Sequence, residues 1–120
     1  MSEIGYEGQP PIDSYGGGGF RIMDGFRAGD LMITPVAGVM DWDAAALSAV
    51  AFEAVFAEAG EIDVLLVGMG AEIAPLPAAT RIAMDEAGIG VEVMSTASAC
   101  RTYNVLLAED RRVAIAARAV

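Results

Sequence analysis

Hydrophobic residues form regular blocks in the second half of the chain. Apolar, strand-like segments at 63–67, 91–94 and 113–120 alternate with two helix-like segments, from about Pro77 to Ala87 and from Ser98 to about Asp110. Strands that alternate with helices of this length are typical of β/α units, in which helices cover a buried parallel sheet. The second half therefore predicts β/α units around a sheet that is at least partly parallel.

Shorter apolar groups, separated by glycine and proline, make up the first half. Two short strands are expected around Gly16 to Gly19, because glycine permits the positive φ of a tight connection. A further extended segment at 30–43 is interrupted by Pro35 and Gly38, which suit an edge or a bulge. These features predict a small antiparallel β element at the N-terminus.

A helix is predicted between the two halves. Ser48 stands at the expected N-cap, and Leu47 and Phe52 occupy the two positions of a hydrophobic staple. Gly60 is expected to end the helix at C′.

Together the patterns predict an α/β fold: one three-layer domain with a mixed central sheet over residues 11–120. A flexible tail rich in glycine, proline and acidic residues is expected over residues 1–10.

Composition removes several classes of chemistry. The chain has no histidine, no lysine and a single cysteine, Cys100. An imidazole base, a lysine Schiff base, a common zinc site and an internal disulfide are therefore excluded. Carboxylates, hydroxyls, one thiol and arginines remain, so we expect no cofactor and favour a protein without enzymatic activity.

Charge and hydropathy narrow the expected partners. The net charge of −10 disfavours nucleic acid, whose binding requires a basic surface. The longest uncharged run, LMITPVAGVM, is about half the roughly 20 residues that a membrane-spanning helix needs. The first residues also lack the basic and apolar regions of a signal peptide. We therefore expect a cytoplasmic protein without a transmembrane segment.

One candidate site lies where two predicted strands end. If the strands at 64–67 and 91–94 are adjacent and parallel, one crevice would contain the loops after both strands and the start of the last helix, namely Gly68, Gly70, Thr96 and Ser98. Free amides at the start of that helix favour an anion, and Arg101 is close in sequence. The alternative is structural: glycines that the strand exit requires, and Ser98 as a simple N-cap.

The last predicted helix carries the other candidate residues. Cys100 falls within its apolar stripe, which predicts a buried and unreactive thiol. Asn104 lies at the margin of that stripe, where its amide can bond loop backbone. Arg101 has small apolar neighbours, which suits a protein contact. Arg112, beyond the helix end, is expected to offset the local acidic residues.

Several stretches resemble a known family: IDSYGGGGFRI, VLLVGMG and above all MSTASACRTYNVLLAEDRRVA. They are similar to the small-domain family that includes mitochondrial complex I assembly factor 3 and an adipogenesis-associated Mth-type domain protein. The most specific positions are Arg101, Thr102, Tyr103, Asn104, Leu107, Glu109, Arg111 and Arg112. The resemblance implies a compact α/β core with a mixed sheet, no known activity or cofactor, and action through protein contacts.

Two functional hypotheses follow. The first is a non-enzymatic assembly or binding protein, whose interface involves the helix from Arg101 to Arg112 and the loop from Gly68 to Pro75. It requires a protein partner and leaves homo-oligomerisation open. The alternative is a domain that binds a small molecule or an anion in the crevice at the strand ends, with or without an enzymatic reaction.

Overall fold

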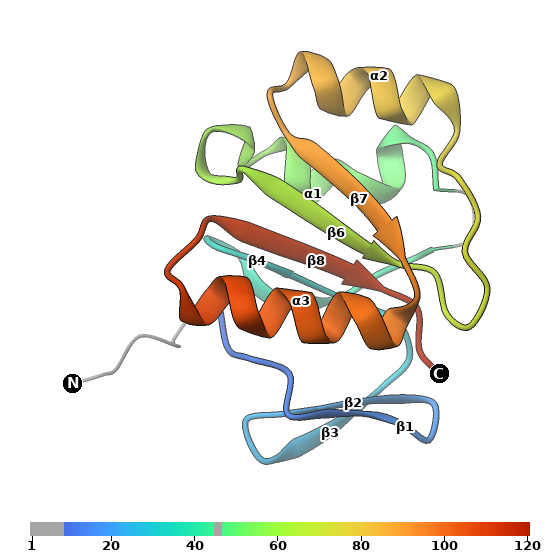
Figure 1. Cartoon of the computed structure of the whole chain (residues 1–120), viewed down its shortest axis with the longest axis vertical. Helices are drawn as coiled ribbons and strands as arrows, with labels where there is room; N and C mark the ends of the chain where they lie inside the picture. The colour runs from blue at the N-terminus through green and yellow to red at the C-terminus, as the bar shows by residue number, and fades with distance from the viewer. Residues whose placement is uncertain (1–8, 45–46) are drawn as a thin grey trace.

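A small antiparallel sheet opens the fold. The computed structural model describes residues 9–44 and 47–120. The first sheet has the order β1-β2-β3 and consists of β1 (Ser14–Gly16), β2 (Gly19–Ile22) and β3 (Gly25–Ala28) (Figure 1). Gly17 and Gly18 connect the first two strands with φ of 65° and 84°, conformations that glycine adopts without strain. The predicted pair of strands is confirmed, and β3 extends it.

The central sheet is mixed, as the sequence predicted. Its order is β5-β4-β8-β6-β7. The strands are β4 (Leu31–Thr34), β5 (Gly38–Asp41), β6 (Val64–Gly68), β7 (Gly90–Met94) and β8 (Val113–Ala117). β4 runs antiparallel to β5 and β8, whereas β6 runs parallel to β7 and β8. The carboxyl ends of β6, β7 and β8 therefore lie together at one end of the sheet.

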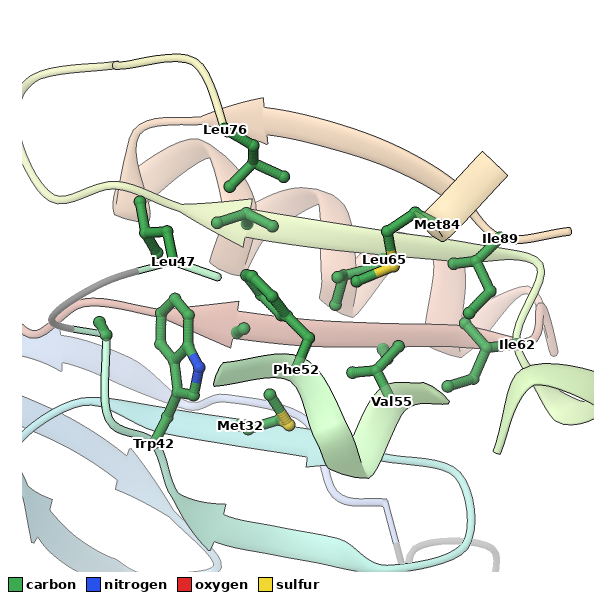
Figure 2. Close-up of a cluster of buried hydrophobic side chains, with 14 of the residues drawn as sticks. Met32, Trp42, Leu47, Phe52, Val55, Ile62, Leu65, Leu76, Met84 and Ile89 are labelled. Carbon is green, nitrogen blue, oxygen red and sulfur yellow. The ribbon is translucent and has the colours of Figure 1, made fainter. Parts of the chain in front are cut away.

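Two hydrophobic cores pack on opposite faces of the central sheet and give the molecule its three layers. The helices α1 (Glu53–Phe56) and α2 (Ala78–Glu86) cover one face, and α3 (Thr96–Ala108) and the small sheet cover the other (Figure 1). Leu65 faces the first core, which Figure 2 shows, and Leu66 faces the second. This alternation follows from the two-residue repeat of a strand.

The helix predicted from Ser48 to Gly60 is not continuous. Ser48 stands at the start but makes no side-chain capping bond. The segment consists of a 3-10 turn, η1 (Ala49–Phe52), the single α-helical turn α1 and a second 3-10 turn, η2 (Ala59–Glu61). Gly60 lies inside η2, so its predicted role as the residue after the helix is wrong.

Tertiary contacts explain this interruption. The backbone leaves helical conformation at Glu58, with φ −114° and ψ 26°. The carboxylate of that residue is buried and accepts hydrogen bonds from the turn between β4 and β5. Leu47 and Phe52, the predicted staple pair, are both buried in the first core. The segment therefore adapts to the core and the turn, whose contacts outweigh its helix propensity.

Candidate functional site

The ends of β6 and β7 meet the start of α3, as the crevice hypothesis required. Thr96 connects them: its backbone N–H donates to Gly70 O at 3.0 Å, and its hydroxyl accepts from Gly70 N–H at 2.9 Å. The same hydroxyl donates to Arg118 O at 2.7 Å, and Arg118 N–H donates to Gly68 O at 2.9 Å. Thr96 is fully buried. Its hydroxyl therefore joins three chain segments and both donates and accepts a hydrogen bond within the protein.

Gly68 lies against α3 without space for a side chain. A β-carbon at this position would lie 3.0 Å from Thr96 Cα, 3.1 Å from Thr96 Oγ1 and 3.2 Å from Ala117 Cβ. Gly70 follows with φ of 84°, in the left-handed region that favours glycine. Close packing at one position and a positive φ at the other are structural reasons for the Gly-Met-Gly sequence.

The N-cap of α3 is Ser95, so the prediction that Ser98 caps this helix is wrong. The helix begins at Thr96, and Ser95 Oγ accepts a hydrogen bond from the backbone N–H of Ser98 at 3.2 Å. One amide that was expected to face an anion is therefore satisfied by the cap. Ser98 itself lies in the first turn and is half-buried.

Tyr103 and Asn104 bind the N-terminal segment. The buried Tyr103 hydroxyl donates to Pro10 O at 2.7 Å. The Asn104 amide accepts from Ile12 N–H at 2.8 Å and donates to Ile12 O at 2.7 Å. The prediction that Asn104 bonds loop backbone is confirmed. The Gln9 side chain donates to Val113 O, so the last two residues of the predicted tail contact the domain. Residues 1–8 of that tail lie outside the described residues.

Arg101 lies within α3, whereas Arg112 lies beyond its C-terminal end. Arg101 is in the second turn of the helix and is exposed, and Val105, one turn later, is 54% exposed. Arg112 pairs with Asp63, with its Nη2 2.6 Å from Oδ1 and its Nε 3.3 Å from Oδ2. The hydrogen bond from Arg112 lowers the pKa of Asp63. Asp63 immediately precedes β6, so Arg112 contacts the opposite end of this strand from Gly68, Gly70 and Thr96.

Cys100 is buried in the second core, as predicted. Its side chain is 2% exposed, and burial raises the pKa of the thiol to about 12. Burial likewise raises the pKa of Tyr103. A thiol in this state is a poor nucleophile, because the thiolate is the reactive form.

We expect Cys100 to react with an aromatic disulfide reagent at pH 8 at least ~100-fold more slowly in the native protein than in the urea-unfolded chain. Absorbance of the released thiol measures both rates. Because the folded pKa of about 12 lies above the ordinary value, the neutral thiol stabilises the fold below about pH 8.5, and this contribution is lost as the pH rises toward 12. Equal labelling rates in the two states would contradict a buried thiol.

Sequence reasoning missed three polar residues with structural roles. Ser95 caps α3, Glu58 holds the turn between β4 and β5, and Arg118 Nη2 donates to Ala44 O at 3.1 Å. The sequence carried a signal for Ser95, because a serine three residues before the capped N–H fits the N-cap position. It also carried a signal for Arg118, which is the one charged residue in the apolar segment 113–120. Within residues 9–44 and 47–120, no group of three or more Cys, Asp or Glu residues could hold a metal ion.

An open groove lies on the other side of the molecule from the small sheet. It has a volume of about 940 Å³ and runs between α2, the preceding loop and β7. Its lining is mainly apolar and includes Leu76, Met84, Ile89, Val91 and Val93. Ile73 and Ile82 line it as well and are 63% and 57% exposed. Ile73, Ala74 and Pro75, which belong to the loop predicted as part of an interface, line this groove, whereas none of the seven predicted site residues does.

Fold and geometry together define a small α/β domain whose polar groups at the strand ends are bonded internally and whose open surface is an apolar groove. The chain belongs to the family described as a protein of unknown function, DUF498/DUF598, which matches residues 12–117. This membership confirms the family resemblance of the sequence.

Three relatives illustrate the family. An uncharacterised protein of Rhodobacter capsulatus is 47% identical over 95% of this chain and 88% of its own length. The zebrafish NADH dehydrogenase [ubiquinone] 1 alpha subcomplex assembly factor 3 is 32% identical over 88% of this chain, which spans 62% of that relative. A Bartonella henselae crystal structure, described as an outer membrane protein, is 41% identical, with a TM-score of 0.89 over 94% of this chain and 97% of that one. In the part of this chain that the structure describes, no helix is long and apolar enough to span a membrane.

Proposed function

We propose that this chain is a non-enzymatic protein-binding domain with a role like that of an assembly factor, in the building of a respiratory or other membrane complex. The relationship to the zebrafish assembly factor supports this class of role. The observation that carries the proposal is a contrast within the structure. Thr96, Cys100 and Asn104 are engaged or buried inside the fold, whereas large apolar side chains remain exposed around the groove. Such a surface suits a protein partner.

The alternative, an anion or small molecule at the strand ends, has less support. The Thr96 hydroxyl and the Ser98 N–H are bonded within the protein, and α3 packs directly on Gly68. An anion site needs donors that are free to face the ligand. With a net charge of −10, we also do not include nucleic acid among the partners. A cytoplasmic location forms part of the proposal.

Deletion of the gene in a bacterium that encodes this chain tests the role. We expect less intact complex I and more of its subassemblies on a native gel of solubilised membranes, stained for NADH oxidation. A plasmid copy of the wild-type gene should restore the complex, and the amount of succinate dehydrogenase should stay constant as the control. Normal amounts of complex I and of the other respiratory complexes in the deletion strain would contradict the assembly role.

A further inference from the structure

Strand β7 has one unpaired side. It lies at an edge of the central sheet, and within the described part of the chain its only strand partner is β6. Gly90 N–H donates to Asp63 O at 2.9 Å, and Met94 O accepts from Met69 N–H at 2.8 Å. In a parallel ladder, alternate residues bond the same neighbour. Gly90, Glu92 and Met94 therefore bond toward β6, and the N–H and C=O groups of Val91 and Val93 point to the open edge.

The groove lies beside these unpaired groups. Val91 and Val93 are half-buried, belong to the periphery of the first core and line the groove, so their side chains lie on the α2 face of the sheet. Ile73 and Ile82 provide exposed apolar walls. An extended peptide on this edge could bond to the backbone of β7 and place alternate side chains against the groove.

The other face of β7 carries a negative charge. Glu92 is exposed and pairs in register with Leu66, which belongs to the core beneath α3, so Glu92 lies on the α3 face. A residue opposite Glu92 on an added strand would be favourable if basic. The groove side also contains Arg81 and Asp85, which offset each other in formal charge. Apolar residues toward the groove and a basic residue toward Glu92 are thus the complementary pattern.

A second copy of this chain fits the edge poorly. In the two-fold antiparallel register centred on Glu92, Val91 of one copy would bond to Val93 of the other, and the two Glu92 side chains would be directly opposite. Like charges at such positions are destabilising, and each copy carries a net charge of −10. The other edge strand of the central sheet is β5. Unlike β7, it contacts the small sheet, since its Asp41 pairs with Arg27 of β3 at 3.0 Å.

We propose that the open edge of β7 is the docking site for an extended segment of a partner protein, which adds a strand to the central sheet. That segment alternates apolar residues, which enter the groove, with basic residues, which face Glu92. The inference rests on the proposed protein-binding function and names its surface and the chemistry of its partner. Backbone hydrogen bonds provide affinity in this mode, and the alternate side chains provide specificity.

A designed peptide tests the docking site. The probe is the capped heptapeptide Thr-Val-Arg-Val-Arg-Val-Thr, and the matched control replaces both arginines with glutamate. Hydrogen exchange of single amides is followed by NMR. In the free protein, the amides of Val91 and Val93 should exchange quickly and that of Glu92 slowly, since only Glu92 bonds to β6. The arginine peptide at saturation should slow Val91 and Val93 by ~10-fold or more.

Two variants sharpen this test. Glu92→Arg keeps the backbone bonds to β6 and should invert the preference, so that the glutamate peptide now binds ~10-fold more tightly than the arginine peptide. Val93→Pro removes a backbone donor from the open edge, where proline is tolerated. In this variant the arginine peptide should no longer slow the exchange of the Val91 amide. If Val93→Pro does not fold, Glu92→Arg decides alone.

Three results would overturn the inference: no protection of Val91 and Val93 by the arginine peptide, equal protection by both peptides, or protection that rises with protein concentration without peptide. The last result would indicate a second copy as the occupant. Normal levels of complex I and of the other respiratory complexes in the deletion strain would instead remove the assembly role and leave the peptide result unchanged. The two failures are therefore distinguishable.

Discussion

Replacement of Glu58 by alanine is expected to lower the free energy of unfolding by about 3 kcal/mol. Glu58 is 8% exposed, and its carboxylate accepts three hydrogen bonds from the β4–β5 turn. The donors are the Thr34 hydroxyl at 2.6 Å, Val36 N–H at 2.8 Å and Ala37 N–H at 2.9 Å. Alanine would leave the Thr34 hydroxyl and Val36 N–H without their acceptor and would open a void beside them, whereas Ala37 N–H would keep its bond to Thr34 Oγ1 at 3.1 Å. Urea denaturation followed by circular dichroism measures the loss.

Two further variants separate this effect from a general loss of charge. Glu58→Gln keeps an acceptor oxygen and should lose only part of the stability. Glu61→Ala removes an exposed acid three residues later and should change the stability little. If Glu58→Ala and Glu61→Ala unfolded at the same urea concentration, the buried carboxylate would not hold the turn.

Gly68→Val is expected to lower the free energy of unfolding by about 3 kcal/mol, at the upper end of the usual cost of overpacking. The first atom of the new side chain would already lie 3.0 Å from Thr96 Cα. Thr96 cannot move aside easily, because its hydrogen bonds to Gly70 and Arg118 connect three segments. The midpoint of thermal unfolding should fall by about 10 °C or more.

Gly60→Ala is the matched control for this glycine. A β-carbon at Gly60 would meet no atom within 4 Å, so this variant should unfold at nearly the wild-type temperature. Gly68→Val would contradict the packed arrangement if it unfolded like Gly60→Ala. That outcome would mean that the strand ends have the free space that a ligand crevice requires.

Two strands of the second half, β6 and β8, were predictable because they are buried. Segments 64–68 and 113–117 lie under helices on both sides, so they read as continuous apolar runs. Asn104 was predictable for a similar reason, since its place at the margin of the apolar stripe leaves backbone as its partner. These conclusions depend on short-range periodicity, which the sequence carries directly.

The missed features depend on contacts between distant residues. Ser95 and Ser98 both fit an N-cap by local pattern, and only the backbone conformation shows that α3 begins at Thr96. Glu58 is one of 17 acidic residues, and its burial depends on a turn more than 20 positions earlier. Arg112 finds Asp63, 49 positions away, instead of its acidic neighbours in sequence.

The position of the groove depends on the order of the strands in the sheet, and hydrophobic periodicity does not determine that order. Segments 91–94 and 64–67 were both predicted as strands, yet β7 lies at an edge and β6 lies between two strands. The sequence hypothesis placed the interface on the helix from Arg101 to Arg112, where the rarest residues gather, and on the loop from Gly68 to Pro75. In the structure, Tyr103 and Asn104 of that helix bond the N-terminal segment. The exposed apolar walls of the groove belong to Ile73 of the predicted loop and to Ile82 of α2, which the hypothesis did not include.

Photo-crosslinking in living cells tests the central claim, that this domain acts by protein contact at the groove. A photoreactive phenylalanine replaces Ile82 in the groove wall or, as a matched control, Val36 in the β4–β5 turn; these side chains are 57% and 67% exposed. We predict one adduct of defined mass from position 82, none from position 36, and loss of the adduct when Glu92→Arg is added. No adduct from position 82, or the same adducts from both positions, would contradict the account.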